Sequence, residues 1–142
     1  MTTLDALDRI LRSLHQATLD DTHWPATSAL IDEVCGMRGN GLVVGPEDDE
    51  PQVYFAMFLS RGERLQDLER QYFEVYHDHD EALPRLRALP DGQLVHVPDL
   101  YTAEEKKTSP AYNEMLRRLG SQNGLDVHFD GPDGLRIVWA TC

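Results

Sequence analysis

The residue types best suited to metal binding gather in the segment Tyr76-His77-Asp78-His79-Asp80. Imidazole nitrogens and carboxylate oxygens are common ligands of zinc and related metals. His77 and His79 share a face only if the backbone is extended, and they point apart at the end of a helix. A third ligand would have to come from a distant residue, such as His96 or His128. The alternative is an exposed helix end that favours cationic histidines, and we predict no metal site.

Other patterns of catalytic residues are missing from the sequence. There is no glycine-rich phosphate loop, no nucleophile elbow and no Ser/His/Asp order in a supporting context. Cys35 and Cys142 have no metal or redox spacing, which indicates two free thiols in a reducing compartment. The acidic run Glu47–Pro51 is interpreted as a solvated loop, with a cation site as the alternative. We therefore predict that the protein is not an enzyme and uses no cofactor.

Four aromatic residues are candidates for binding a small molecule. Tyr72, Tyr76 and Tyr112 fall in segments with helical spacing, and Trp139 falls in an apolar C-terminal strand. Ligand pockets in α/β sensors form between the sheet and its covering helices, and aromatic groups with polar tips suit such places. For each of them the favoured interpretation is that the side chain only fills the core. We name Tyr72, Tyr76, Tyr112 and Trp139 as candidate ligand-binding residues.

The C-terminal third of the chain predicts its elements most clearly. Thr102 and Glu105 form a capping box, and Ser109-Pro110 offers a second helix start. Large apolar residues then alternate with smaller or polar ones on both sides of the turn segment 130–134: Leu125, Val127, Phe129, Leu135, Ile137 and Trp139. This alternation predicts a hairpin with these six side chains on one face.

Two details of the hairpin follow from this pattern. If Phe129 faces Leu135, the large apolar residues of both strands share one side of the sheet. Asp126 and Arg136 are then neighbours, and we expect them to form a surface ion pair.

Four leucines form a stripe in the first segment of the chain. Leu4, Leu7, Leu11 and Leu14 follow one another at spacings of three, four and three residues, and Thr2 or Thr3 can cap such a helix. A stripe of this kind packs against a sheet or against a second copy of itself. Core packing is the favoured interpretation of this stripe, and the alternative is a dimer interface, for which we name the four leucines as candidates.

The order of the predicted elements determines the fold class. Two helices occupy about residues 3–36, and the sheet with its further helices occupies 38–142. Strands are expected at 42–44, 53–59 and 94–97 and in the hairpin, and a long helix is expected at 63–75. Strands adjacent in sequence favour antiparallel hairpins. We predict one α/β (α+β) domain over residues 1–142, with about five mainly antiparallel strands covered by helices, similar to PAS and GAF domains.

Composition limits the partners of the protein. The 142 residues include 25 acidic and 13 basic side chains, for a formal charge of −12. A chain this acidic repels phosphate backbones, so DNA contact is expected only through a domain absent from this chain. No apolar run approaches the length of a membrane span and no secretory signal is present, so we expect a cytoplasmic protein without membrane contact.

One long segment resembles a known family. The run DLYTAEEKKTSPAYNEMLRRLGSQNGLDVHFDGPDGLRIVWA is similar to the N-terminal sensory region of bacterial LuxR-type helix-turn-helix transcription regulators, as are residues 22–25, 72–80 and 83–86. The resemblance implies a PAS- or GAF-like sensor upstream of a DNA-binding domain, without catalytic residues. This chain contains no helix-turn-helix. The expected function is a regulatory sensor that binds a small-molecule signal and forms a homodimer, and the alternative is a ligand-free dimerisation or protein-interaction module.

Overall fold

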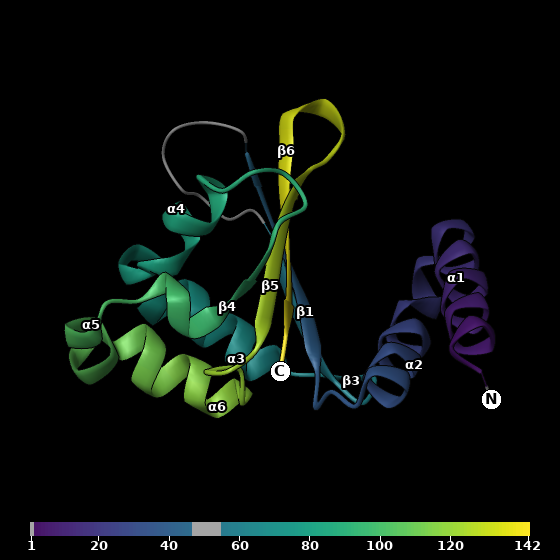
Figure 1. Ribbon diagram of the computed structural model, residues 1–142, viewed down its shortest axis with the longest axis horizontal. Helices are drawn as coiled ribbons and strands as arrows, with labels where there is room; N and C mark the ends of the chain where they lie inside the picture. The colour runs from purple at the N-terminus through teal and green to yellow at the C-terminus, as the bar shows by residue number, and fades with distance from the viewer. Residues whose placement is uncertain (1, 47–54) are drawn as a thin grey trace.

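A single antiparallel sheet forms the centre of the computed structural model, which describes residues 2–46 and 55–142. Within these residues the sheet has six strands in the order β3-β2-β1-β6-β5-β4 (Figure 1). The strands are β1 (Asn40–Pro46), β2 (Phe55–Ser60), β3 (Glu63–Arg64), β4 (Leu94–His96), β5 (Leu125–Asp130) and β6 (Leu135–Thr141). The predicted α/β class with an antiparallel sheet is confirmed, and the predicted count of about five strands was approximate. The acidic run Glu47–Pro51 lies outside the described residues.

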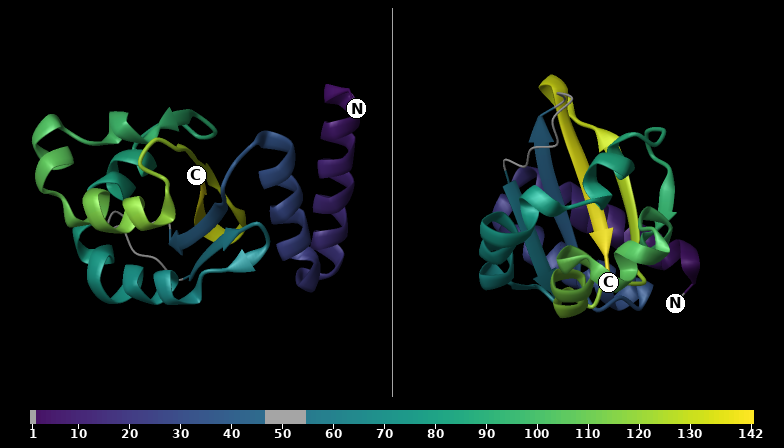
Figure 2. Two further views of the ribbon diagram at one scale, coloured as in Figure 1. Left: turned by 90° about the horizontal axis from the view of Figure 1, so that it is seen from below. Right: turned by 90° about the vertical axis from the view of Figure 1, so that its left-hand side faces the viewer.

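Helices lie on both sides of this sheet (Figures 1 and 2). They are α1 (Thr3–Leu19), α2 (Trp24–Cys35), α3 (Gln66–Gln71), α4 (Ala82–Arg87), α5 (Ala103–Thr108) and α6 (Arg117–Leu119). The last four cover one face, while α1 and α2 stand together beyond the other face. The helix expected at 63–75 begins later, because Glu63 and Arg64 form the short strand β3. None of the helices in the described ranges has the length and apolar character needed to cross a membrane.

Short irregular helical turns extend two of these helices. A π-turn at Tyr72–Tyr76 and a 3₁₀ turn at His77–His79 continue α3, and a second π-turn at Ala111–Leu116 runs into α6. Local sequence signals set several boundaries as predicted. The capping box of Thr102 and Glu105 opens α5, and the hydroxyl of Ser109 accepts a hydrogen bond from the backbone N–H of Tyr112 at 3.2 Å.

The hairpin β5–β6 confirms the predicted strands but not the predicted pairing. Phe129 lies opposite Ile137 rather than Leu135, and Asp130 lies opposite Arg136. The pairing is shifted by two residues, which is a full period of a strand, so every side chain keeps its expected face. The prediction of an ion pair between Asp126 and Arg136 is wrong. Asp126 lies opposite Ala140, and the guanidinium of Arg136 donates to the backbone oxygen of Arg87.

The two sheet faces have different partners. Val43, Phe58 and Val138 are buried under the helices α3 to α6 and form the core with side chains from them and from their connecting segments. The opposite face carries Trp139, whose Nε1 donates to Oδ1 of Asn40 at 3.3 Å. The large apolar residues of β5 and β6 therefore lie on the side of the sheet that α3 to α6 leave uncovered.

Asp32 connects α2 to the sheet. Its side chain is completely buried. Oδ1 accepts from Nδ2 of Asn40 on β1 at 2.8 Å, and Oδ2 accepts from the backbone N–H of Arg61 in the β2–β3 turn at 3.0 Å. Arg61 has a φ of 53°, a conformation that is uncommon for a residue with a side chain. One carboxylate thus fixes the position of α2, β1 and a strained turn.

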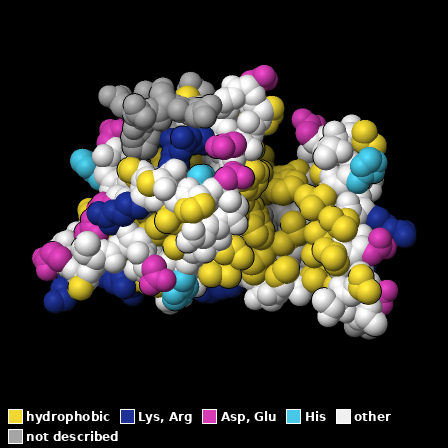
Figure 3. Space-filling model, turned by 45° about the horizontal axis from the view of Figure 1, so that its top comes forward, with side chains coloured by type: hydrophobic (Ala, Val, Ile, Leu, Met, Phe, Trp, Pro, Cys, Tyr) yellow, Lys and Arg dark blue, Asp and Glu magenta, His cyan; other side chains and the backbone are white. Residues whose placement is uncertain are grey.

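The first helix packs on α2 but leaves most of its leucine stripe in solvent. Ser13 on α1 and Thr27 on α2 share a hydrogen bond of 2.7 Å between their hydroxyls. Leu4, Leu7 and Leu11 are 75%, 50% and 55% exposed. Figure 3 shows hydrophobic side chains gathered in the hollow between the sheet and the pair α1–α2. The stripe therefore does not pack against the sheet of its own chain.

Candidate functional site

A cavity of about 370 Å³ lies between the sheet and the helices that cover it. Strand residues Val43, Phe58 and Val138 line one side, and Leu86 and Met115 line the other. Its volume falls in the range of small-molecule sites, and its walls are mainly apolar, as such sites usually are. The polar groups that face it include two carboxyl groups, those of Asp80 and Asp126.

Asp80 holds one end of the cavity wall. Its Oδ2 accepts from the Tyr72 hydroxyl at 2.6 Å, and its Oδ1 accepts from the backbone N–H groups of Ala82 and Leu83 at 3.1 and 3.2 Å. The π-turn and the 3₁₀ turn between Tyr72 and Asp80 bring these two side chains together. Burial raises the pKa of Asp80, although the three donors oppose this change. Burial and the nearby carboxylate raise the pKa of Tyr72 well above its usual value, so its hydroxyl stays protonated as a donor.

Asp126 is the second acidic group of the cavity. It projects from β5 on the face that the helices cover, beside Ala140 of β6. Its Oδ1 is buried and has no hydrogen-bond partner among the described residues. Burial, with a smaller contribution from the charge of Asp80, raises the pKa of Asp126 to about 7. Such a group is half ionised near neutral pH and leaves an acceptor free inside the protein.

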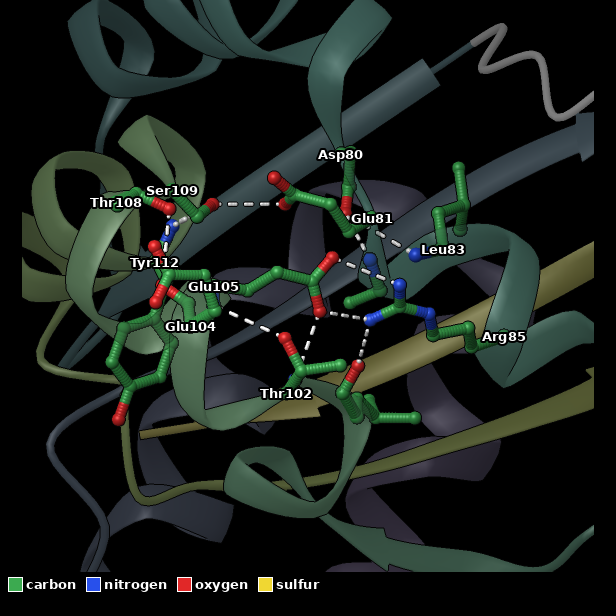
Figure 4. A network of polar contacts seen from close by, with 12 residues as sticks. Asp80, Glu81, Leu83, Arg85, Thr102, Glu104, Glu105, Thr108, Ser109 and Tyr112 are labelled. Carbon is green, nitrogen blue, oxygen red and sulfur yellow. Dashed lines mark hydrogen bonds and ion pairs between the residues drawn. The ribbon is translucent and has the colours of Figure 1, made fainter.

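A polar network holds the elements around Asp80 in place (Figure 4). Arg85 of α4 donates to both carboxylate oxygens of Glu105 at 2.6 and 2.9 Å and to the backbone oxygen of Leu100 at 2.7 Å. Glu105 also accepts from the backbone N–H of Thr102 at 2.8 Å. These contacts, with the hydrogen bond to Arg85 first, lower the pKa of Glu105 to about 2. The network links α4 to α5 across the outer side of the cavity.

The carboxyl group of Glu81, next to Asp80, makes a further link in the same region. Its Oε2 accepts from the hydroxyl of Ser109 at 2.9 Å. Ser109 precedes the second π-turn, which carries Met115 into the cavity wall. The segments that surround the cavity are therefore tied to one another as well as to the sheet.

The two cysteines lie in different surroundings. Cys35 is exposed, and both cysteines are free. Cys142 lines the cavity, and burial raises the pKa of its thiol to about 11. A thiol with a raised pKa is a poor nucleophile at neutral pH.

The histidine-rich segment does not form a metal site in the part of the chain that the structure describes. The structure there contains no group of three or more His, Cys, Asp or Glu residues that is able to hold a metal ion. Nδ1 of His77 lies 3.4 Å from Oδ1 of its neighbour Asp78. The carboxylate of Asp80 instead accepts from the hydroxyl of Tyr72.

The predicted ligand-binding aromatics are not brought together. Tyr72 lines the cavity. Tyr76 is buried in the core, and Tyr112 packs against Tyr101 with ring centroids 4.9 Å apart. Trp139 lies on the sheet face opposite the cavity. A role of these four residues in binding stays a prediction, which the geometry favours for Tyr72 alone.

Comparison with known proteins shows which solved structures share this fold. No protein-family model matches the chain, and no curated protein matches it. The crystal structure of the VqsR LBD domain from Pseudomonas aeruginosa is similar, with a TM-score of 0.60 and 12% identity over 96% of this chain and 77% of that one. The structure of SdiA in complex with octanoyl-rac-glycerol has a TM-score of 0.61 and 12% identity over 99% of this chain, which spans 55% of the SdiA chain.

At a sequence identity this low, the structural similarity shows a shared fold. VqsR and SdiA are LuxR-type regulators, and the similarity covers nearly the whole of this chain. The resemblance to the sensory region of these regulators is thus confirmed at the level of structure: the chain has the fold of the N-terminal ligand-binding domains of LuxR-type transcription regulators.

Proposed function

We propose that this chain is the regulatory sensor domain of a LuxR-type transcription regulator and that a small molecule in the cavity is its signal. The observation that carries the proposal is the cavity of about 370 Å³ under α3 to α6, which contains a free buried acceptor on Asp126. The SdiA structure holds octanoyl-rac-glycerol, which supports small-molecule binding in this fold. The domain would act in the cytoplasm, without catalysis, and would reach DNA only through another domain.

The arrangement offers a route from ligand to conformation. A ligand in the cavity touches the sheet on one side and segments joined to α4 and α6 on the other. It shifts the domain between two states only if it binds them with different affinity. The Arg85–Glu105 contact joins α4 to α5, so a change at the cavity wall reaches the outer surface. We expect that surface to pass the state to the DNA-binding domain.

Filling the cavity tests this proposal. Ala140 lines the cavity beside Asp126, and Ala140→Phe would place a ring in the space that a ligand needs. We expect ligands found by thermal-shift screening of metabolites to raise the melting temperature of the wild type. The same compounds should leave the melting temperature of Ala140→Phe unchanged. We expect this variant to bind them about 100-fold or more weakly than the wild type does, which is equivalent to about 2.7 kcal/mol.

Ile137→Phe is the matched control for this variant. Ile137 lies on the same strand, but its side chain is on the opposite face and does not line the cavity. This variant should keep the full response. A screen in which no compound shifts the wild type, or in which both variants respond as the wild type does, would contradict ligand sensing in this cavity.

Dimerisation through the leucine stripe of α1 is a second candidate function. It is favoured by the exposure of Leu4, Leu7 and Leu11, which the sequence predicts as an interface together with the less exposed Leu14. An exposed stripe of large apolar side chains is unusual on a monomer and is typical of association surfaces. We propose that a second copy of the chain covers this stripe, as an isologous contact between two α1 helices.

A charge on the stripe is expected to dissociate such a dimer. We predict that Leu7→Asp and Leu11→Asp each weaken association at least about ten-fold, because a carboxylate would have to be buried in an apolar contact. Light scattering across a concentration series measures the mass. Gln16→Asp, on the opposite side of α1, adds the same charge and should leave the dimer intact. Equal monomeric masses for the wild type and all variants would remove the interface.

A further inference from the structure

The polar end of the cavity is acidic. Asp80 and Asp126 both line it, and the charge of Asp80 acts on Asp126. Tyr101, which also lines the cavity, is affected by Asp80, Glu81, Asp126 and Glu105. Burial raises the pKa of Tyr101, and these four carboxyl groups act in the same direction, while the guanidinium of Arg85 also interacts with Tyr101.

The two aspartates differ in what they still accept. Asp80 already takes hydrogen bonds from Tyr72, Ala82 and Leu83. Asp126 takes none on its buried Oδ1 from any described residue. A buried carboxyl oxygen without a donor is costly, and Asp126 faces the cavity. The missing donor is therefore best supplied by a molecule that enters the cavity.

The charged groups around this site act on different members of it. Among the described residues, the only charge acting on Asp126 is that of Asp80. Arg87 acts on Tyr72, which donates to Asp80, and Arg38 acts on Cys142. The guanidinium groups of Arg38, Arg117 and Arg118 belong to exposed residues along the cavity lining. A donor that also carries positive charge would gain from both aspartates, whereas a neutral donor would gain from the hydrogen bond alone.

The rest of the cavity lining is mainly apolar. Leu86, Met115 and Val138 are almost completely buried and line the cavity as well. An apolar group of the ligand that displaces water from these side chains gains free energy in proportion to its buried area. The cavity thus combines two carboxyl groups with a mainly apolar lining.

We propose that the signal bound in this cavity is a hydrophobic amine, whose ammonium group donates to the free oxygen of Asp126 and lies beside Asp80, with its apolar part against Leu86, Met115 and Val138. This inference rests on the proposed function, because it names the chemical class of the ligand at the same site. It assigns Asp126 as the residue that selects for positive charge.

Three molecules with the same eight-carbon body and different head groups test the inference: n-octylamine, n-octanol and sodium octanoate. Isothermal titration calorimetry on the purified chain gives the affinity of each, and the wild type alone decides whether positive charge is preferred. We expect the affinity for the amine to be at least about ten-fold higher than that for the alcohol, and we expect octanoate to bind most weakly. In Asp126→Asn the preference of amine over alcohol should fall to about three-fold or less.

Asp130→Asn is the matched control, since it removes the same charge from an exposed position on the same strand. It should keep the wild-type preference. Equal binding of amine and alcohol to the wild type, or an unchanged preference in Asp126→Asn, would overturn the amine assignment and leave the ligand cavity intact. Failure of all three molecules to bind would overturn the amine assignment, and a null metabolite screen beside it would overturn the cavity as a sensor site as well.

Discussion

Asp126→Asn is expected to stabilise the protein at about pH 8 by up to about 4 kcal/mol, the free energy that corresponds to a carboxyl pKa raised from 3.8 to about 7. The unfolded chain ionises Asp126 above its ordinary pKa, whereas the folded chain holds the proton until about pH 7. Stability from this group is therefore present at low pH and decreases as the pH rises between the two values. Asparagine does not ionise, so this loss does not occur.

The measurement is urea unfolding of the wild type and the variant at several pH values. Their difference should be small near the lower pKa and should grow until about pH 7. The groups that interact electrostatically with Asp126 are Asp80, Tyr101 and Cys142. Asp80 also has a raised pKa, so the wild type and the variant share a second decline, which cancels in their difference except for the part that depends on the charge of Asp126. Parallel pH profiles would show that Asp126 is not buried as described, and Asp130→Asn should change stability by less than about 0.5 kcal/mol.

Asp32→Ala is expected to destabilise the protein by about 3 kcal/mol or more. The change leaves the side-chain amide of Asn40 and the backbone N–H of Arg61 without their acceptor in a buried place. The β2–β3 turn loses the contact that supports its positive φ at Arg61. Helix α2 then loses its polar attachment to the sheet, so α1 and α2 should loosen together.

Urea unfolding measures this loss, and amide hydrogen exchange shows where it falls. Protection should decrease first in α2 and in the β2–β3 turn. Glu33→Ala changes the next residue of α2, which is exposed, and should stay within about 0.5 kcal/mol of the wild type. Asp32→Asn keeps one acceptor oxygen, so its loss of stability should lie between those of Asp32→Ala and Glu33→Ala. A loss as small as that of Glu33→Ala would show that the bonds to Asn40 and Arg61 contribute little.

The sequence predicted elements where a local signal determines them. The pair Thr102 and Glu105 forms its capping box, and Ser109 accepts from the backbone N–H of Tyr112 at the second predicted helix start. The alternation of apolar residues predicted β5 and β6 and the sharing of faces between them. These signals act within a few residues of one another, so no knowledge of distant contacts is needed to use them.

The cavity was harder to predict because it depends on which sheet face the helices cover. Alternation tells which residues share a face, and the size of Phe129, Ile137 and Trp139 suggested that theirs was the covered one. The helices α3 to α6 cover the other face, with Val138 and Asp126. For this reason Asp126 was interpreted as a surface residue and Trp139 as a pocket residue. Only the long-range packing of the helices distinguishes the two arrangements.

Asp80 was missed for a different reason. Its neighbours His77 and His79 suggested metal ligands, and a regular helix would not have brought Asp80 to Tyr72. The π-turn and the 3₁₀ turn that follow α3 do so, and hydrophobic periodicity carries no signal for such turns.

If a ligand binds in the cavity, the attachment of Asp80 would make ligand recognition and folding compete for the same carboxylate oxygens. Its carboxylate starts α4 through the N–H groups of Ala82 and Leu83 while it also faces the cavity. A guest molecule that draws this carboxylate toward itself must take it from the first turn of α4. That helix carries Arg85, whose guanidinium forms an ion pair with Glu105. Binding of a ligand in the cavity would therefore order or disorder the short helix α4. No hinge between rigid bodies would be needed.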